Sequence, residues 1–108
     1  MGLPVLAIPE ALMPQLATIL RNSGIEVDEL PISEQDDPEH FLMCLVCKMG
    51  NGCVALSIQR ELHVNPDGVV IIIYPRRRRA DKLIEHVSLT LQEHGAWIPK
   101  RSQSKLKT

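Results

Sequence analysis

Four consecutive arginines, at positions 76–79, are the residues with the clearest chemical potential in this chain. They come just before a segment with helical periodicity, so we expect them at the start of a helix, where four cations oppose the helix macrodipole and require compensation. Arginine forks and the free backbone amides of a helix N-terminus both bind phosphate or carboxylate groups. The pattern therefore predicts a site for an anionic partner, either a nucleic acid or an acidic protein. The predicted partner-binding residues are Arg76, Arg77, Arg78, Arg79, Lys100, Arg101, Lys105 and Lys107.

The distribution of charge along the chain fits such a partner but leaves other interpretations open. Residues 1–67 hold ten acidic and three basic side chains, a net charge of −7, whereas residues 68–108 hold three acidic and nine basic, a net charge of +6. Three alternatives for the arginines are a solvated charge run, internal pairing with the acidic segment 26–39, and a nuclear-targeting patch. A sequence pI of about 6.4 disfavours the nonspecific nucleic-acid binding typical of strongly basic domains.

One histidine and three cysteines, His40, Cys44, Cys47 and Cys53, have a spacing that superficially suits zinc. A tetrahedral site needs ligands that converge on one point. Cys44 and Cys47 lie an odd number of residues apart in a predicted strand, which directs their side chains to opposite faces of the sheet. We therefore predict no metal site and interpret the cysteines as small buried apolar residues. A zinc site would require the predicted strand to be wrong.

No combination of nucleophile and base in the sequence predicts catalysis. His63, His86 and His94 have no recognisable catalytic companions, and Ser57 has no nucleophile-elbow context. The glycines on either side of Asn51 are better explained by a turn than by a phosphate-binding loop. We therefore expect a non-catalytic binding protein without a cofactor.

The element that must position these residues is an antiparallel meander over residues 41–74, in which apolar runs are separated by two turns. The dipeptide Asn51-Gly52 suits a type I′ turn, because both of its central residues need positive φ. This turn places Gly50 opposite Cys53. The register puts mostly apolar pairs on one face of the hairpin and a more polar set on the other.

The second turn and the flanking elements follow from turn residues and periodicity. The turn over residues 65–68 is predicted to be type I, with Gly68 in the left-handed conformation. Trp97 is expected to fold back onto the core. The other expected elements are a helix over residues 10–23 ended by Gly24, an edge strand over 25–32, an acidic loop over 33–39, a helix from Ala80 ended by Gly95, and over 3–8 either a short edge strand or a packed arm.

The order of these elements predicts an α+β open-faced sandwich. An antiparallel meander of three to five strands carries an N-terminal and a C-terminal helix packed on one face. Residues 1–99 are expected to form a single domain, and residues 100–108 a basic flexible tail. Because the last strand is apolar on both sides, the other face is a candidate for homodimer formation or partner docking. The second hypothesis is therefore a protein–protein interaction module (a chaperone, inhibitor or adaptor) that uses the exposed sheet face or an edge strand.

Composition also restricts the setting in which the chain works. One Phe, one Trp and one Tyr argue against an aromatic platform for single-stranded nucleic acid. The apolar runs are far shorter than the roughly 20 residues that span a bilayer, so no membrane is expected as a partner. Three cysteines, an odd number, do not fit a secreted disulfide framework. We therefore expect a cytoplasmic protein in a reducing compartment.

Overall fold

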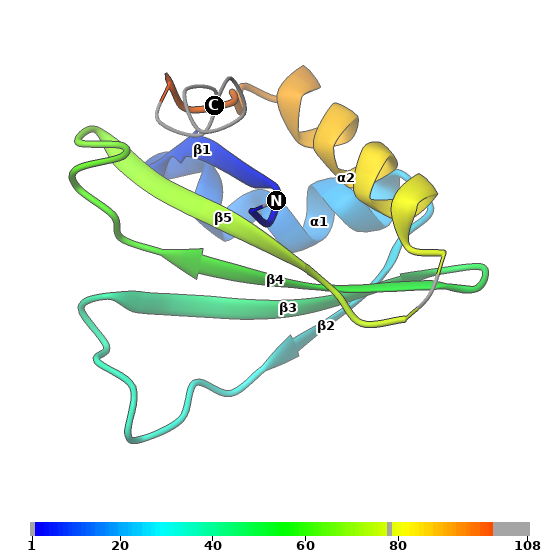
Figure 1. The fold of residues 1–108 in the computed structure, drawn as a ribbon, viewed down its shortest axis with the longest axis horizontal. Coiled ribbons are helices and arrows are strands. Elements are labelled where there is room, and N and C mark those ends of the chain that lie inside the picture. The colour runs from blue at the N-terminus through cyan, green and yellow to red at the C-terminus, as the bar shows by residue number, and fades with distance from the viewer. Residues whose placement is uncertain (1, 78, 101–108) are drawn as a thin grey trace.

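Five antiparallel strands form a single sheet in the order β1-β5-β4-β3-β2 (Figure 1). The computed structural model describes residues 2–77 and 79–100, and within them no helix is long and apolar enough to cross a membrane. The α+β class and the antiparallel sheet predicted from the sequence are confirmed. The elements are β1 (Val5–Pro9), the 3-10 helix η1 (Glu10–Gln15), α1 (Leu16–Asn22), β2 (Glu26–Leu30), β3 (Phe41–Met49), β4 (Gly52–Gln59), β5 (Gly68–Pro75) and α2 (Asp81–Glu93).

The hydrophobic core joins both α-helices to one face of the sheet, and Figure 1 shows the two helices on the same side of the strands. Residues of this core cluster recur every three or four positions in the helices and at alternate positions in the strands, which are the periods of elements that face a core on one side. The intervening strand positions point away from the helices and form a second face. The core residues of the helices and strands are Leu16, Ile19, Leu20, Leu83, Val87, Leu91, Leu6, Ile8, Val27, Leu45, Cys47, Val54, Leu56, Ile58, Val69, Ile71 and Ile73.

The β3–β4 hairpin turns one residue earlier than the sequence predicts. Met49 pairs with Gly52, so the two central turn residues are Gly50, with φ of 57°, and Asn51. Positive φ at the first central position is the pattern of a type II′ turn. Gly52 lies in the strand instead, where a Cβ atom would come within 3.1 Å of the Leu83 Cβ of α2. The predicted pairing of Gly50 with Cys53 is therefore wrong, but between Met43 and Ile58 the partners shift by two residues, so these side chains keep their predicted faces. At the bulge between Phe41 and Met43 the register changes, and Phe41 pairs with Gln59, which was predicted to lie on the other face.

The second turn also differs from its predicted form. Gly68 does not adopt positive φ; it is the first residue of β5 and pairs with Pro9 of β1. A Cβ atom at Gly68 would lie 2.2 Å from the carbonyl oxygen of Ile8, so the close approach of β1 explains the glycine. The buried side chain of Asn65 secures this junction, since its Nδ2 donates to the carbonyl oxygens of Ile8 (3.1 Å) and Val69 (3.0 Å).

Proline divides the first predicted helix into two conformations. The segment before Leu16 is a 3-10 helix that contains Pro14, and only the segment after it is α-helical. Pro14 has no N–H to donate, and its ring would clash with the carbonyl four residues earlier in an α-helix. The expectation of one continuous helix is corrected accordingly. Gly24 (φ 85°) and Gly95 (φ 111°) end the two α-helices as predicted.

Both edges of the sheet are short strands from outside the meander. The N-terminal segment that was expected to be either an edge strand or a packed arm forms β1, which pairs with β5 along its whole length. On its outer edge Ala7 and Trp97 exchange two backbone hydrogen bonds, of 2.7 and 2.9 Å. Trp97 thus returns to the sheet through its backbone, whereas 42% of the residue stays exposed. At the opposite edge, β2 pairs with β3 as the predicted edge strand.

Candidate functional site

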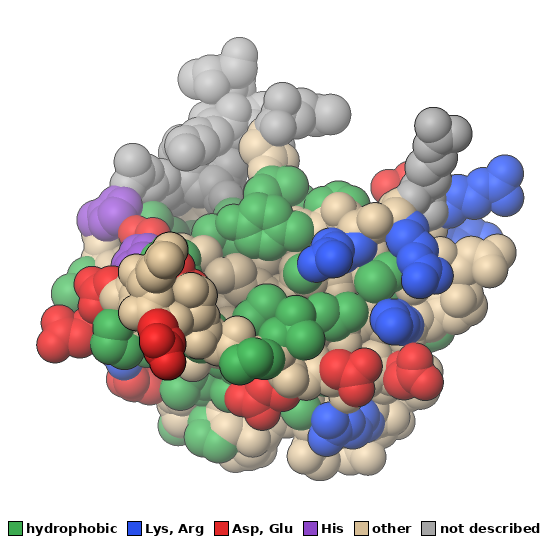
Figure 2. All heavy atoms as spheres, turned by 90° about the horizontal axis from the view of Figure 1, so that it is seen from below, with side chains coloured by type: hydrophobic (Ala, Val, Ile, Leu, Met, Phe, Trp, Pro, Cys, Tyr) green, Lys and Arg blue, Asp and Glu red, His purple; other side chains and the backbone are tan. Residues whose placement is uncertain are grey.

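The face of the sheet turned away from the helices carries an apolar band across several strands. Figure 2 shows this side of the molecule, where hydrophobic side chains gather in the middle. The register places the band in two adjacent cross-strand rows. Leu30 and Tyr74 are 41% and 38% exposed. We call this surface the open face; its residues are Val5, Leu30, Cys44, Val46, Ala55, Ser57, Ile72 and Tyr74.

One end of the open face is hollowed and surrounded by cations. The hollow has a volume of about 360 Å³ and is reached from three strands and from the connection that follows β5. The backbone N–H of Arg76 donates to the carbonyl oxygen of Cys53 (2.8 Å), which anchors the start of the arginine run beside β4. We call this site the basic hollow; its lining residues are Asp28, Leu30, Val46, Lys48, Cys53, Arg76 and Arg77.

The structure brings only part of the predicted arginine site together. Arg76 and Arg77 line the basic hollow, whereas Arg79 is exposed on the connection to α2. Lys100 is exposed and does not line the hollow. The remaining predicted residues, Arg78, Arg101, Lys105 and Lys107, lie outside the described residues.

The arginines precede the last helix instead of forming its first turn. Helix α2 begins at Asp81 with Ala80 as N-cap, and the acidic Asp81 in the first turn suits the positive end of the helix macrodipole. Arg79 has φ of 64°, so the chain cannot continue as a helix through this position. The predicted placement of four cations at the helix N-terminus is therefore wrong. Arg76, Arg77 and Arg79 instead lie on the connection between β5 and α2.

Two charged residues of the hollow were not foreseen from the sequence, Lys48 and Asp28. Lys48 precedes the hairpin turn on β3, and Asp28 lies on β2, which joins β3 only through long-range pairing. The alternation of β3 was a usable signal for Lys48, because it shares its face with Val46 two positions earlier. No local signal existed for Asp28.

The cations of the hollow have no internal counter-ion among the described residues. No described carboxylate lies within ion-pair distance of Arg76, Arg77 or Lys48. Among the acidic side chains of segment 26–39, only Asp28 lines the hollow. Figure 2 shows Lys and Arg side chains grouped at one end of this face, with acidic side chains at the other end and along one edge. In the described part of the chain, internal pairing therefore does not neutralise the arginines.

The three free cysteines occupy three different environments. Cys47 is fully buried in the core, and burial, with smaller contributions from the neighbouring thiols, raises its pKa to about 12. Cys44 lies on the open face, where partial burial raises its pKa and the charge of Arg76 lowers it in part. Cys53 lies beside the basic hollow. Cys44 and Cys47 therefore point to opposite faces, as strand alternation predicted, and do not converge as zinc ligands.

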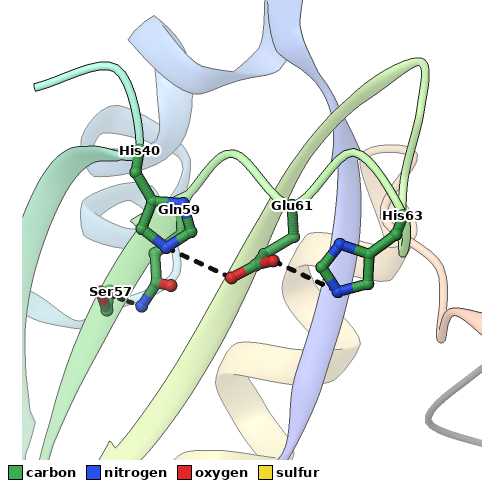
Figure 3. A network of polar contacts seen from close by, with 5 residues as sticks. All are labelled: His40, Ser57, Gln59, Glu61 and His63. Carbon is green, nitrogen blue, oxygen red and sulfur yellow. Dashed lines mark hydrogen bonds and ion pairs between the residues drawn. The ribbon is translucent and has the colours of Figure 1, made fainter. Parts of the chain in front are cut away.

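A polar cluster lies near the start of β3 and the end of β4 (Figure 3). Glu61 lies between two imidazoles, with His40 Nε2 at 3.3 Å from one carboxylate oxygen and His63 Nε2 at 3.5 Å from the other. The Ser57 hydroxyl accepts a hydrogen bond of 2.8 Å from Gln59 Nε2. Because the Ser57 hydroxyl bonds to an amide and not to an imidazole, Ser57 is not arranged as an activated nucleophile.

The two histidines of α2 contact backbone carbonyls. His86 Nε2 lies 2.9 Å from the carbonyl oxygen of Ser23, which links α2 to the end of α1. His94 Nδ1 lies 2.9 Å from the carbonyl oxygen of Thr90 in its own helix. Both contacts have a structural role, in helix packing and in helix termination.

Comparison of the chain with protein-family models, with curated proteins and with solved structures found no match. Any function must therefore be inferred from the geometry of the chain itself.

Proposed function

We propose that this chain is a small non-catalytic binding protein that holds an acidic protein segment on its open face. In this proposal Arg76, Arg77 and Lys48 bind carboxylates of the partner, and the apolar band buries its hydrophobic side chains. The observation that carries the proposal is that the cations surround a hollow whose apolar residues, Leu30 and Val46, belong to the open face. Charge and apolar area are thus offered on one continuous surface.

This combination favours a protein over a nucleic acid. A phosphate backbone is recognised by cations and by hydrogen-bond donors, and it gains little from an apolar floor. Asp28 in the hollow would repel phosphates but can accept hydrogen bonds from a peptide. Protein interfaces typically combine an apolar centre with a polar rim that contains arginine, which is the layout of this face.

The proposal uses the arrangement of an open-faced sandwich, in which both helices cover one face and leave the other to the partner. An apolar band that crosses several strands and includes the exposed Leu30 and Tyr74 is a candidate site of interaction. The three free cysteines fit a reducing compartment, and we place the protein in the cytoplasm on that ground.

The test is a titration of ¹⁵N-labelled protein with two anionic probes of equal charge. One probe is a twelve-residue peptide of alternating Glu and Leu, and the other is a short DNA duplex. We expect the peptide to shift the backbone amide signals of Lys48, Cys53 and Arg76, and the duplex to leave them nearly unchanged.

Matched single variants then identify the contact. Arg76→Gln should weaken peptide binding about tenfold, which corresponds to roughly 1.4 kcal/mol. Lys82→Gln removes the same charge from an exposed position on α2 outside the hollow, and it should have little effect. Tighter binding of the duplex than of the peptide, or equal losses in the two variants, would contradict the proposal.

A further inference from the structure

We infer that the partner on the open face is a second copy of this chain, bound with opposite strand polarity, so that the acidic loop of each copy fills the basic hollow of the other. The acidic loop is residues 33–39. The inference rests on the proposed function, because it supplies the acidic segment that the open face is proposed to hold.

The acidic loop and the cations of the basic hollow lie toward opposite ends of β3, although Leu30, near the loop, also lines the hollow. The loop connects β2 to β3, next to the pair Leu30 and Cys44. The hollow includes Cys53 and Arg76, next to the β3–β4 turn at the other end of β3. Figure 1 shows the connection between β2 and β3 and the end of β5 on opposite sides of the molecule. From Phe41, where the loop enters β3, to Lys48 in the hollow is seven residues along the strand, or about 23 Å at roughly 3.3 Å per residue.

The charges of the two ends are complementary. The loop contains four carboxylates and no base, and Glu34, Asp37 and Glu39 are exposed. Three cations and one acid line the hollow. Among the described residues, no Lys or Arg pairs with a loop carboxylate, and no acid pairs with the cations of the hollow. Each end therefore lacks the counter-charge that the other end carries.

The conformation of the loop keeps its carboxylates available. Backbone N–H groups of Asp36 and His40 donate to the carbonyl oxygens of Ser33 and Asp37, each at 3.0 Å. The side chain of Asp37 also accepts a hydrogen bond of 2.9 Å from the backbone N–H of Glu39. These local bonds shape the loop without any cation, so its charges are free to act on another molecule.

A two-fold axis satisfies both ends at once. If two open faces meet with the axis in the interface and perpendicular to the strands, each loop lies over the hollow of the other copy. An axis parallel to the strands would bring the cationic ends of both copies to the same end of the dimer, where they repel. In the favoured arrangement the apolar rows around Cys44 and Val46 lie near the axis, and the two charged contacts lie at the rim. An unrelated acidic partner would satisfy the hollow but leave the loop of this chain unmatched.

The test is sedimentation velocity on charge-reversal variants, alone and mixed. Arg76→Glu/Arg77→Glu makes the hollow acidic, and Glu34→Lys/Glu39→Lys reduces the net charge of the loop from −4 to zero. Neither glutamate side chain has a hydrogen bond or ion pair within the described part of the chain. Glu85→Lys/Glu93→Lys, on the exposed side of α2, makes the same charge change away from the open face. Far-UV circular dichroism of each variant verifies that it is folded.

We expect wild type and the α2 control to form dimers, and each reversal variant alone to dissociate at least about 100-fold more readily. A one-to-one mixture of the two variants should restore a dimer, because the unchanged acidic loop of the first variant then meets the unchanged basic hollow of the second. A monomeric wild type, or a mixture that stays monomeric, would overturn the inference. The proposed function is tested separately, by titrating the monomeric Glu34→Lys/Glu39→Lys variant with the Glu-Leu peptide. If the peptide binds but the mixture of variants stays monomeric, only the dimer is refuted. If the peptide does not bind, the proposed function itself is refuted.

Discussion

Replacement of Asn65 by alanine should remove the bond that ties the turn before β5 to strand β1. The Asn65 side chain is 3% exposed, and its Nδ2 donates to the carbonyl oxygens of Ile8 and Val69 at 3.1 and 3.0 Å. Each bond contributes roughly 1 kcal/mol, and a buried carbonyl left unsatisfied costs about 1–3 kcal/mol. We therefore expect Asn65→Ala to lower the free energy of unfolding by about 2–4 kcal/mol, which corresponds to roughly 8–16 °C in Tm for a domain of this size.

Urea unfolding monitored by far-UV circular dichroism measures this loss. Asn22→Ala, at an exposed position with no side-chain bond in the described part of the chain, is the matched control and should change stability by less than about 0.5 kcal/mol. The variant Asn65→Asp tests the direction in which stability changes with pH. Burial against carbonyl oxygens raises the folded-state pKa of the new carboxyl, so its loss of stability should grow as pH rises above the unfolded value. Equal unfolding midpoints for Asn65→Ala and Asn22→Ala would refute the reasoning.

Three further outcomes follow from other contacts. The hydrogen bond and charge of Arg60 lower the pKa of Glu10, which NMR titration should detect and Arg60→Gln should abolish. Because the folded-state pKa is lowered, the small contribution of this pair to folding stability should be lost as pH falls through the pKa of Glu10. Gly52→Ala should cost about 1–3 kcal/mol in urea unfolding, because its Cβ would lie 3.1 Å from Leu83 Cβ; an unchanged midpoint would contradict that packing. Cys47, buried and with a pKa of about 12, should react with iodoacetamide only after unfolding, as mass spectrometry would detect.

The composition of the two sheet faces could be predicted from the sequence, but the hairpin register could not. Alternation assigns Leu45 and Val46 to opposite faces wherever the turn lies, and an even shift in pairing preserves that assignment. The turn itself was a choice between two overlapping dipeptides, Gly50-Asn51 and Asn51-Gly52, both with suitable residues. The contact of Gly52 with Leu83, thirty-one residues later, favours the first. Local turn preference contains no information about that contact.

The candidate site, too, could be predicted from the sequence only in part. The arginine run is visible in the sequence, and Arg76 and Arg77 do line the hollow. Their exact setting was not predictable, because the start of α2 depends on the positive φ of Arg79, which residue preferences do not indicate. Asp28 enters the hollow through the pairing of β2 with β3, across a loop whose sequence does not specify where the two strands meet.

The alkylation rate of Cys44 in the folded protein tests most directly whether the open face is the docking surface. Cys44 is partly exposed on that face, and buried Cys47 serves as an internal control for unfolding. Iodoacetamide is the reagent, and mass spectrometry measures the labelling of each cysteine. We expect the alkylation rate of Cys44 to fall at least about tenfold in two situations: when the protein concentration rises through the dimerisation range, and when the Glu-Leu peptide saturates the monomer. Cys47 should stay unlabelled in both. A Cys44 rate that is the same at every protein concentration and with saturating peptide would contradict the assignment of the open face as the binding surface.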